Sequence, residues 1–107
     1  TALMVAAQRG HERVVELLLQ RGAEINLLDR KGGTALMVAA LFNRPAVVRR
    51  LLRAGADAAA PTVDGKTALW WAKEKGHAEC VRAIEEHAAA EAEAEAAARE
   101  AERAAAE

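Results

Sequence analysis

Apolar side chains along the first part of the chain follow a helical spacing. Val14, Val15, Leu18 and Leu19 fall at positions i, i+1, i+4 and i+5, and polar residues lie between and around them. This spacing gathers the apolar side chains into one stripe along a helix. The same stripe recurs 33 residues later, at Val47, Val48, Leu51 and Leu52.

A second pattern has the same period of 33 residues. The heptapeptide Thr-Ala-Leu-Met-Val-Ala-Ala occupies residues 1–7 and again residues 34–40, and a variant, Thr-Ala-Leu-Trp-Trp-Ala-Lys, occupies residues 67–73. A fixed period of this length predicts a stack of similar small units, each too small to bury its apolar face alone.

The first unit reads as two helices followed by a loop. Residues 2–9 favour a short helix that ends at Gly10, and residues 12–21 favour a second helix that ends at Gly22. Glycine adopts the left-handed backbone conformation that commonly terminates a helix. The segment 23–33 is rich in Asn, Asp and Gly, which predicts an extended connection with a tight turn.

The later copies keep this plan with two informative changes. Asn43 takes the place of the first helix-ending glycine, and Pro45 stands at the start of a helix, where its missing N–H costs little. In the third copy Ala88 replaces the second helix-ending glycine, so the helix that starts at Ala78 should continue through residues 88–107. Glu85 replaces an apolar residue of the earlier stripes, which predicts that the stack ends there.

The sequence therefore divides into a repeat region and a helical extension. The extension is built almost only of Ala, Glu and Arg, and it resembles semi-rigid helical spacers. The chain also opens inside a repeat without a methionine, which favours a piece of a longer protein or an engineered chain. We predict repeats at 1–30, 31–63 and 64–87, and the Ala/Glu/Arg-rich extension at 88–107.

Composition narrows the function without naming it. The net charge is −1, no apolar run is long enough to span a membrane, and the single cysteine excludes an internal disulfide. We expect a soluble intracellular protein, cytoplasmic or nuclear. No nucleophile–base pair, paired acids or metal-binding set converges on one face, so we expect no enzyme activity, cofactor or metal.

At this point the residues resemble the ankyrin repeat family, whose 33-residue motif they follow in three in-phase copies. In the first copy the matching residues are Thr1-Ala2-Leu3, Ala6-Ala7, Gly10-His11, Val14-Val15, Leu17-Leu18-Leu19, Gly22-Ala23 and Asn26. The later copies open with Asp29, Gly32-Gly33-Thr34-Ala35-Leu36 and with Gly65-Lys66-Thr67-Ala68-Leu69. Thr62 and Ala59 replace the family's Asp and Asn in the second loop, so that loop should be less rigid than the first.

The resemblance implies an all-α solenoid of stacked helix–turn–helix units with projecting β-hairpin loops, called fingers, and a long C-terminal helix. It also implies protein binding through a concave face, which finger tips and inner helices form. Carried over position by position, the contact residues of this concave face are Gln8, Arg9, Leu28, Arg30, Lys31, Gly33, Leu41, Phe42, Pro61, Val63, Asp64, Lys66, Trp70, Glu74 and Lys75.

Several of these positions are apolar although nothing in the repeat requires it. A set of apolar residues surrounded by charged ones is typical of a binding patch. Here that set is Leu28, Leu41, Phe42, Pro61 and Val63. The alternative is that Leu41 and Phe42 pack locally.

Trp70 and Trp71 are the only tryptophans. Trp71 shares its repeat position with two valines, which favours the core. Trp70 either faces the groove or packs within the stack.

Other candidate sites have simpler structural interpretations. Arg44, Arg49, Arg50 and Arg53, with Glu16 in register with Arg49, indicate a solvated outer helix face more than a phosphate site. Asn26 resembles the residue that asparaginyl hydroxylases modify in this family, although a turn residue that bonds its own loop is the commoner case.

His11 and His77 occupy one position two repeats apart, too far to share a metal. Cys80 takes the place of a stripe valine, which indicates a buried, inert thiol.

These observations predict a non-catalytic module that binds another protein, with no nucleic acid, membrane or small-molecule substrate among its partners. The alternative is a structural fragment or spacer of a longer repeat protein, or a designed chain with no partner of its own.

Overall fold

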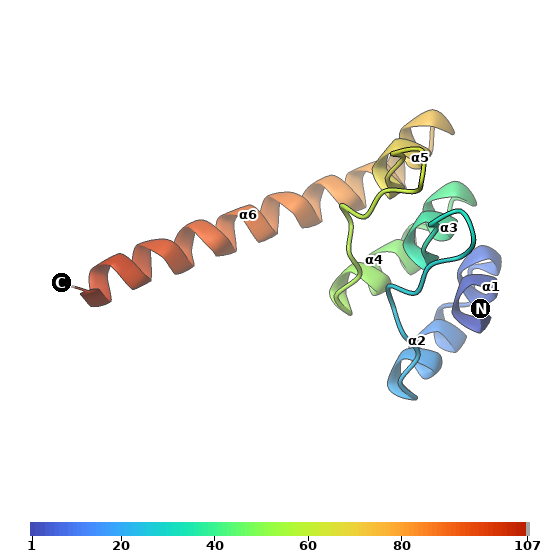
Figure 1. The fold of residues 1–107 in the computed structure, drawn as a ribbon, viewed down its shortest axis with the longest axis horizontal. Helices are drawn as coiled ribbons and strands as arrows, with labels where there is room; N and C mark the ends of the chain where they lie inside the picture. Colours follow the sequence, from blue (N-terminus) through green and yellow to red (C-terminus); the bar gives the residue numbers. More distant parts are fainter. Residues whose placement is uncertain (107) are drawn as a thin grey trace.

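The computed structural model describes residues 1–106, and these residues form six α-helices and no strand (Figure 1). The helices alternate between short inner and longer outer ones, as the 33-residue period predicts. They are α1 (Ala2–Arg9), α2 (Glu12–Gln20), α3 (Ala35–Leu41), α4 (Pro45–Arg53), α5 (Ala68–Glu74) and α6 (Ala78–Ala106). None of these helices combines the length and apolar content that crossing a bilayer requires.

The threonine that opens each heptapeptide caps an inner helix. Its hydroxyl oxygen accepts a hydrogen bond from the backbone N–H three residues later, at Met4, Met37 and Trp70, over 3.1, 3.3 and 3.2 Å. Such a cap stabilises a helix by about 1 kcal/mol. At the other end, Gly10 and Asn43 both have positive φ, 72° and 57°, which confirms the predicted left-handed termination.

The helices pack as two layers. Inner helices α1, α3 and α5 stack side by side, and α2, α4 and the start of α6 form the outer layer (Figure 1). The stripe residues of α4 and the leucine at the start of α3 lie between the layers, where Val47, Val48, Leu51 and Leu36 are almost completely buried. The predicted stripe is therefore the core of the stack.

The first copy of the stripe is less buried than the other two. Val14 is 45% exposed, whereas Val47 and Cys80, at the same repeat position, are at most 1% exposed. A preceding repeat covers this position in the second and third copies, and α1 and α2 lie at the end of the stack. The stripe is therefore not buried at Val14, because burial at this repeat position depends on the neighbouring repeat.

Polar groups join successive repeats at one recurring place. The Arg44 guanidinium donates from Nε to the Gln8 carbonyl over 2.9 Å, and His77 Nδ1 lies 2.9 Å from the Ala40 carbonyl. Both carbonyls belong to the last turn of the inner helix in the preceding repeat, where no intrahelical N–H is left to satisfy them. His77 therefore has a structural partner.

The loops also connect to each other. Asn26 Oδ1 accepts a hydrogen bond from the backbone N–H of Asp57 over 2.8 Å. The expectation that Asn26 bonds its own loop is wrong, because the two connections run close enough for its side chain to reach the next one. Asp57 in turn accepts from the N–H of Ala59 over 3.0 Å.

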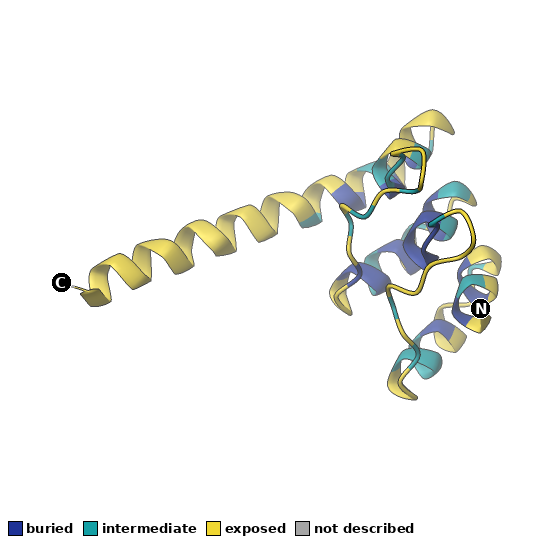
Figure 2. Ribbon diagram, viewed as in Figure 1, coloured by how far each residue is buried: buried dark blue, intermediate teal, exposed yellow. Residues whose placement is uncertain are grey.

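The final helix extends far beyond the stack. α6 has 29 residues, and every described residue beyond His87 is exposed (Figure 2). At its start His87 Nε2 lies 2.9 Å from Glu91 Oε1, and further along Arg99 forms an ion pair with Glu95, each one turn away along the same helix. The predicted continuation through Ala88 is confirmed as far as Ala106, and residue 107 lies outside the described residues.

Cys80 is fully buried, as the stripe predicts, and burial raises the pKa of its thiol. Because the thiolate is the reactive form, we expect Ellman's reagent at pH 8 to modify native Cys80 at least about tenfold more slowly than the urea-unfolded chain. Time courses at 412 nm in the two states would measure this. Equal rates would contradict the burial of this thiol.

Candidate functional site

Two short turns form the finger tips. In the first, Asp29 N–H donates to the Gly33 carbonyl over 2.9 Å, and Asp29 Oδ1 accepts from the N–H groups of Lys31 and Gly33. The second turn closes in the same way between Thr62 and Lys66, also over 2.9 Å. The β-hairpins that the resemblance implies are thus hydrogen-bonded turns, since no strand is present in residues 1–106.

The chemistry of the two turns differs as the sequence suggests. Asp29 accepts two backbone N–H groups, whereas the Thr62 hydroxyl oxygen accepts one, from Lys66 over 3.0 Å. Thr62 also donates to Asp64. This hydrogen bond is the main reason why the pKa of the Asp64 carboxyl lies below its usual value, and a hydrogen bond from Lys66 is the second. That the second loop is less rigid stays a prediction.

The fingers lie against each other. The N–H of Val63 donates to the Lys31 carbonyl over 3.1 Å, so residues 31 and 63 are adjacent although 32 positions separate them. Gly32 makes this approach possible, because a Cβ there would lie 3.2 Å from the Val63 nitrogen. The contact brings the side chains of two repeats onto one surface.

The apolar residues proposed for the concave face are mostly accessible. Val63 is 84% exposed, Leu28 57% and Phe42 45%. Pro61 is also exposed, and Leu41 is half-buried. The alternative of local packing therefore fits Leu41 better than Phe42.

The polar candidates are also accessible, with one exception. Gly33 is buried, and its N–H is already bonded to Asp29, so it offers a partner almost no surface. Lys66 is half-buried. The exposed polar candidates are Gln8, Arg9, Arg30, Lys31, Asp64, Glu74 and Lys75.

The two tryptophans meet beside the second finger. Their rings form an edge-to-face pair with centroids 4.9 Å apart, and Lys66 Nζ lies 4.5 Å from the centroid of the Trp70 ring. Lys66 also pairs with Asp64 over 3.1 Å. Trp71 packs against the core as expected, while Trp70 stays 38% exposed and joins the surface around the finger.

Two arginines of the cluster, Arg49 and Arg50, form ion pairs between outer helices. Arg50 contacts Glu16 over 3.1 Å and Glu12 over 3.5 Å, and Arg49 contacts Glu79 over 3.2 Å. Glu16 shares its repeat position with Arg49, but the ion pair that it forms is with Arg50. Neighbouring residues point about 100° apart around a helix, so Arg50 faces the first repeat and Arg49 the third.

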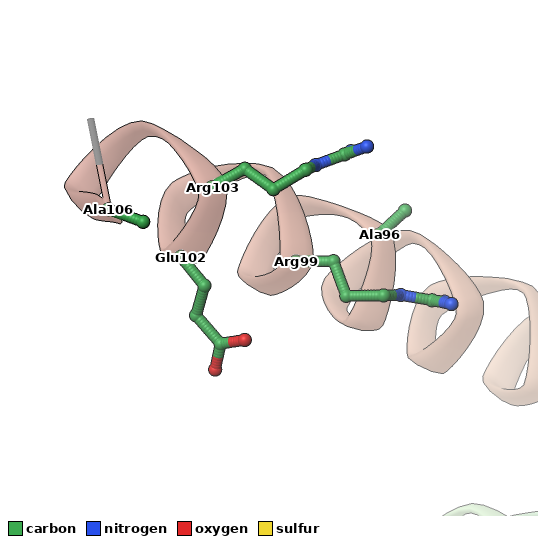
Figure 3. Close-up of a pocket in the computed structure, with 5 residues that line it drawn as sticks. All are labelled: Ala96, Arg99, Glu102, Arg103 and Ala106. Atoms are coloured by element: carbon green, nitrogen blue, oxygen red, sulfur yellow. The ribbon is translucent and has the colours of Figure 1, made fainter.

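No cluster of three or more potential metal ligands occurs within the described part of the chain. One hollow lies along the end of α6, lined by Ala96, Arg99, Glu102, Arg103 and Ala106 (Figure 3). All five residues belong to one helix, and Glu102 and Arg103 point to different sides of it. A single exposed helix cannot enclose a ligand, so this hollow is no candidate site.

Sequence reasoning missed one residue of the exposed apolar surface. Leu27 is 44% exposed and directly precedes Leu28 in the first connection. Two consecutive leucines in a polar loop are a signal that could have indicated it. Its exposure extends the apolar surface at the base of the first finger.

Comparisons with known proteins agree with this architecture. The family model for ankyrin repeats in three copies matches residues 1–62, and the model of a single ankyrin repeat matches residues 64–95. A search of curated proteins finds no match. Among solved structures, the chain is similar to the human ASB11 ankyrin repeat domain, with 31% identity and a TM-score of 0.78.

That match covers 81% of this chain, which spans 39% of the length of the ASB11 chain. The family model alone accounts for more than half of the sequence, and the stacked helix pairs and helix-ending glycines agree with it. The chain belongs to the ankyrin repeat family.

Proposed function

We propose that this chain is a non-catalytic module that binds another protein on its concave face. Ankyrin repeats are generally protein-interaction modules and generally lack enzyme activity. The exposed apolar side chains of this chain support a partner site on its fingers and inner helices.

Seven large apolar side chains are exposed among residues 1–106. Four of them belong to the proposed concave face, and a fifth, Leu27, adjoins it. The other two, Val5 and Val14, lie on the helices at the end of the stack. Exposed apolar groups surrounded by charged residues are typical of protein-binding surfaces, and this distribution is the observation on which the proposal depends. The four are Leu28, Phe42, Val63 and Trp70.

The test compares two double variants with equal charge changes. Leu28→Glu with Phe42→Glu places two carboxylates on the concave face, and Val5→Glu with Val14→Glu places two on similarly exposed valines at the end of the stack. We expect a protein captured from lysate by the unchanged chain to bind the first variant at least about tenfold more weakly, since hot-spot substitutions cost 2 kcal/mol or more. Calorimetry with the purified partner would measure this, and circular dichroism would establish that both variants are folded.

The valine variant should retain the partner. Equal capture by all three folded chains would contradict the proposal and favour the spacer interpretation. Loss of the partner only in the valine variant would move the binding site to the end of the stack.

A further inference from the structure

We propose that the partner of the concave face presents an acidic segment with interspersed apolar side chains. This inference rests on the proposed function and adds the chemistry of the partner. The distribution of charge, the ion pairs and the neighbouring cationic and apolar groups on the fingers support it.

The charge of the chain is divided between its two parts. Residues 88–107 contain six glutamates and two arginines, a net charge of −4, and residues 1–87 contain 13 basic and 10 acidic residues, a net charge of +3. α6 carries its acidic extension away from the stack (Figure 1). The ion pair found in the described part of this extension, between Arg99 and Glu95, lies within α6 itself, so the extension does not neutralise the fingers.

Four of the five basic side chains of the concave face lack acidic partners. Arg9, Arg30, Lys31 and Lys75 are exposed and form no ion pair within residues 1–106, whereas the fifth, Lys66, pairs with Asp64. In the outer layer Arg49 and Arg50 are paired, and Arg21 and Arg53 form no ion pair within these residues. The acids of the concave face cannot compensate. Asp64 is already bonded to Thr62 and paired with Lys66. Glu74 is therefore the one other acidic side chain among the proposed contact residues.

Cationic and apolar groups lie beside one another on the fingers. The hydrogen bond from Val63 to Lys31 sets an exposed valine beside an exposed lysine, and Lys66 lies over the Trp70 ring. Leu28 lies two residues before Arg30. A segment that alternates carboxylates with apolar side chains would pair with both sets of groups at once. Complementary charge also steers such a partner toward the surface.

Nucleic acid fits these observations less well. Affinity for nucleic acid depends largely on how many phosphates the basic side chains neutralise. The concave face offers five basic residues, and one of them is already paired with Asp64. Two aromatic side chains of the concave face, Phe42 and Trp70, are exposed among residues 1–106, so successive bases would find only these two to stack on, because Leu28 and Val63 are aliphatic.

The experiment selects random 12-residue peptides, displayed on phage, against the immobilised full chain at 150 mM salt. We expect the selected peptides to be enriched in Asp or Glu together with Leu, Phe or Trp, and their Kd to rise with salt. Arg30→Glu with Lys31→Glu should raise the Kd at least about tenfold. The matched control, Arg21→Glu with Arg53→Glu, makes the same charge change at the ends of the outer helices, and it should leave the Kd unchanged. Both arginines are exposed and form no ion pair within residues 1–106.

The outcomes separate this inference from the proposed function. If the selected peptides show no acidic enrichment but bind the Leu28→Glu, Phe42→Glu variant more weakly, the acidic-segment inference is wrong. The concave face would still be the binding site. Peptides that bind all variants equally would overturn both. Displacement of the peptides by a 20-nucleotide oligo-dT strand, or a selection that yields no binder, would also overturn the acidic-segment inference.

Discussion

Replacing Leu51 by alanine should lower the free energy of unfolding by about 2–5 kcal/mol, the cost of deleting a buried leucine side chain. Leu51 is fully buried in α4, which packs against the outer helices of both neighbouring repeats and against α3. With neighbours on every side, little can move in to fill the cavity. Urea unfolding followed by circular dichroism at 222 nm would give the change, with the m-value unchanged if both states keep their compactness.

Leu18 provides a matched control, because it occupies the same repeat position in α2. It is only half-buried, since α2 packs mainly against α1 and α4 and has no outer helix on its other side. We expect Leu18→Ala to cost less than half as much as Leu51→Ala. Equal losses would contradict the view that neighbouring repeats, and not the stripe itself, determine burial.

Local features of this fold follow from the sequence. The helices and their ends depend on residues within one repeat: a threonine that caps the inner helix, an apolar stripe, and a glycine or asparagine that ends a helix. Each acts over a few residues, so the bounds predicted for α1 and α2 agree with the structure to within one residue. The absence of a helix-ending glycine at Ala88 predicted the extended α6 for the same reason.

Contacts between repeats could not be predicted in the same way. Asn26 bonds Asp57, and Arg50 rather than Arg49 meets Glu16, because these contacts depend on how one repeat is rotated against the next. A difference of one residue turns a side chain by about 100° toward the other neighbour. Most residues that repeat position proposes for a concave face are exposed, but the burial of Gly33 and the exposure of Leu27 could not be predicted from it.

Gly32→Ala should lower the free energy of unfolding by about 2–3 kcal/mol, through two costs that the structure separates. Gly32 has φ of 81°, where an alanine costs roughly 1–2 kcal/mol relative to the right-handed conformation. The added Cβ would also lie 3.2 Å from the Val63 nitrogen and 3.3 Å from the Thr62 Cα. These are backbone atoms, so the second finger must shift and the hydrogen bond from Val63 to Lys31 must lengthen, at a cost of about 1 kcal/mol.

Gly65 isolates the first cost from the second. It holds the same place in the second turn and has the same φ of 81°, yet a Cβ there would meet no atom within 4 Å. Gly65→Ala should therefore cost only the conformational part, about 1–2 kcal/mol. Thermal unfolding of both variants by circular dichroism would show a melting temperature about 4–8 °C lower for Gly32→Ala than for Gly65→Ala. Identical melting temperatures would mean that the contact between the fingers contributes nothing to stability. The positions of the exposed side chains on the two fingers would then be determined within each turn and not by the contact between the fingers.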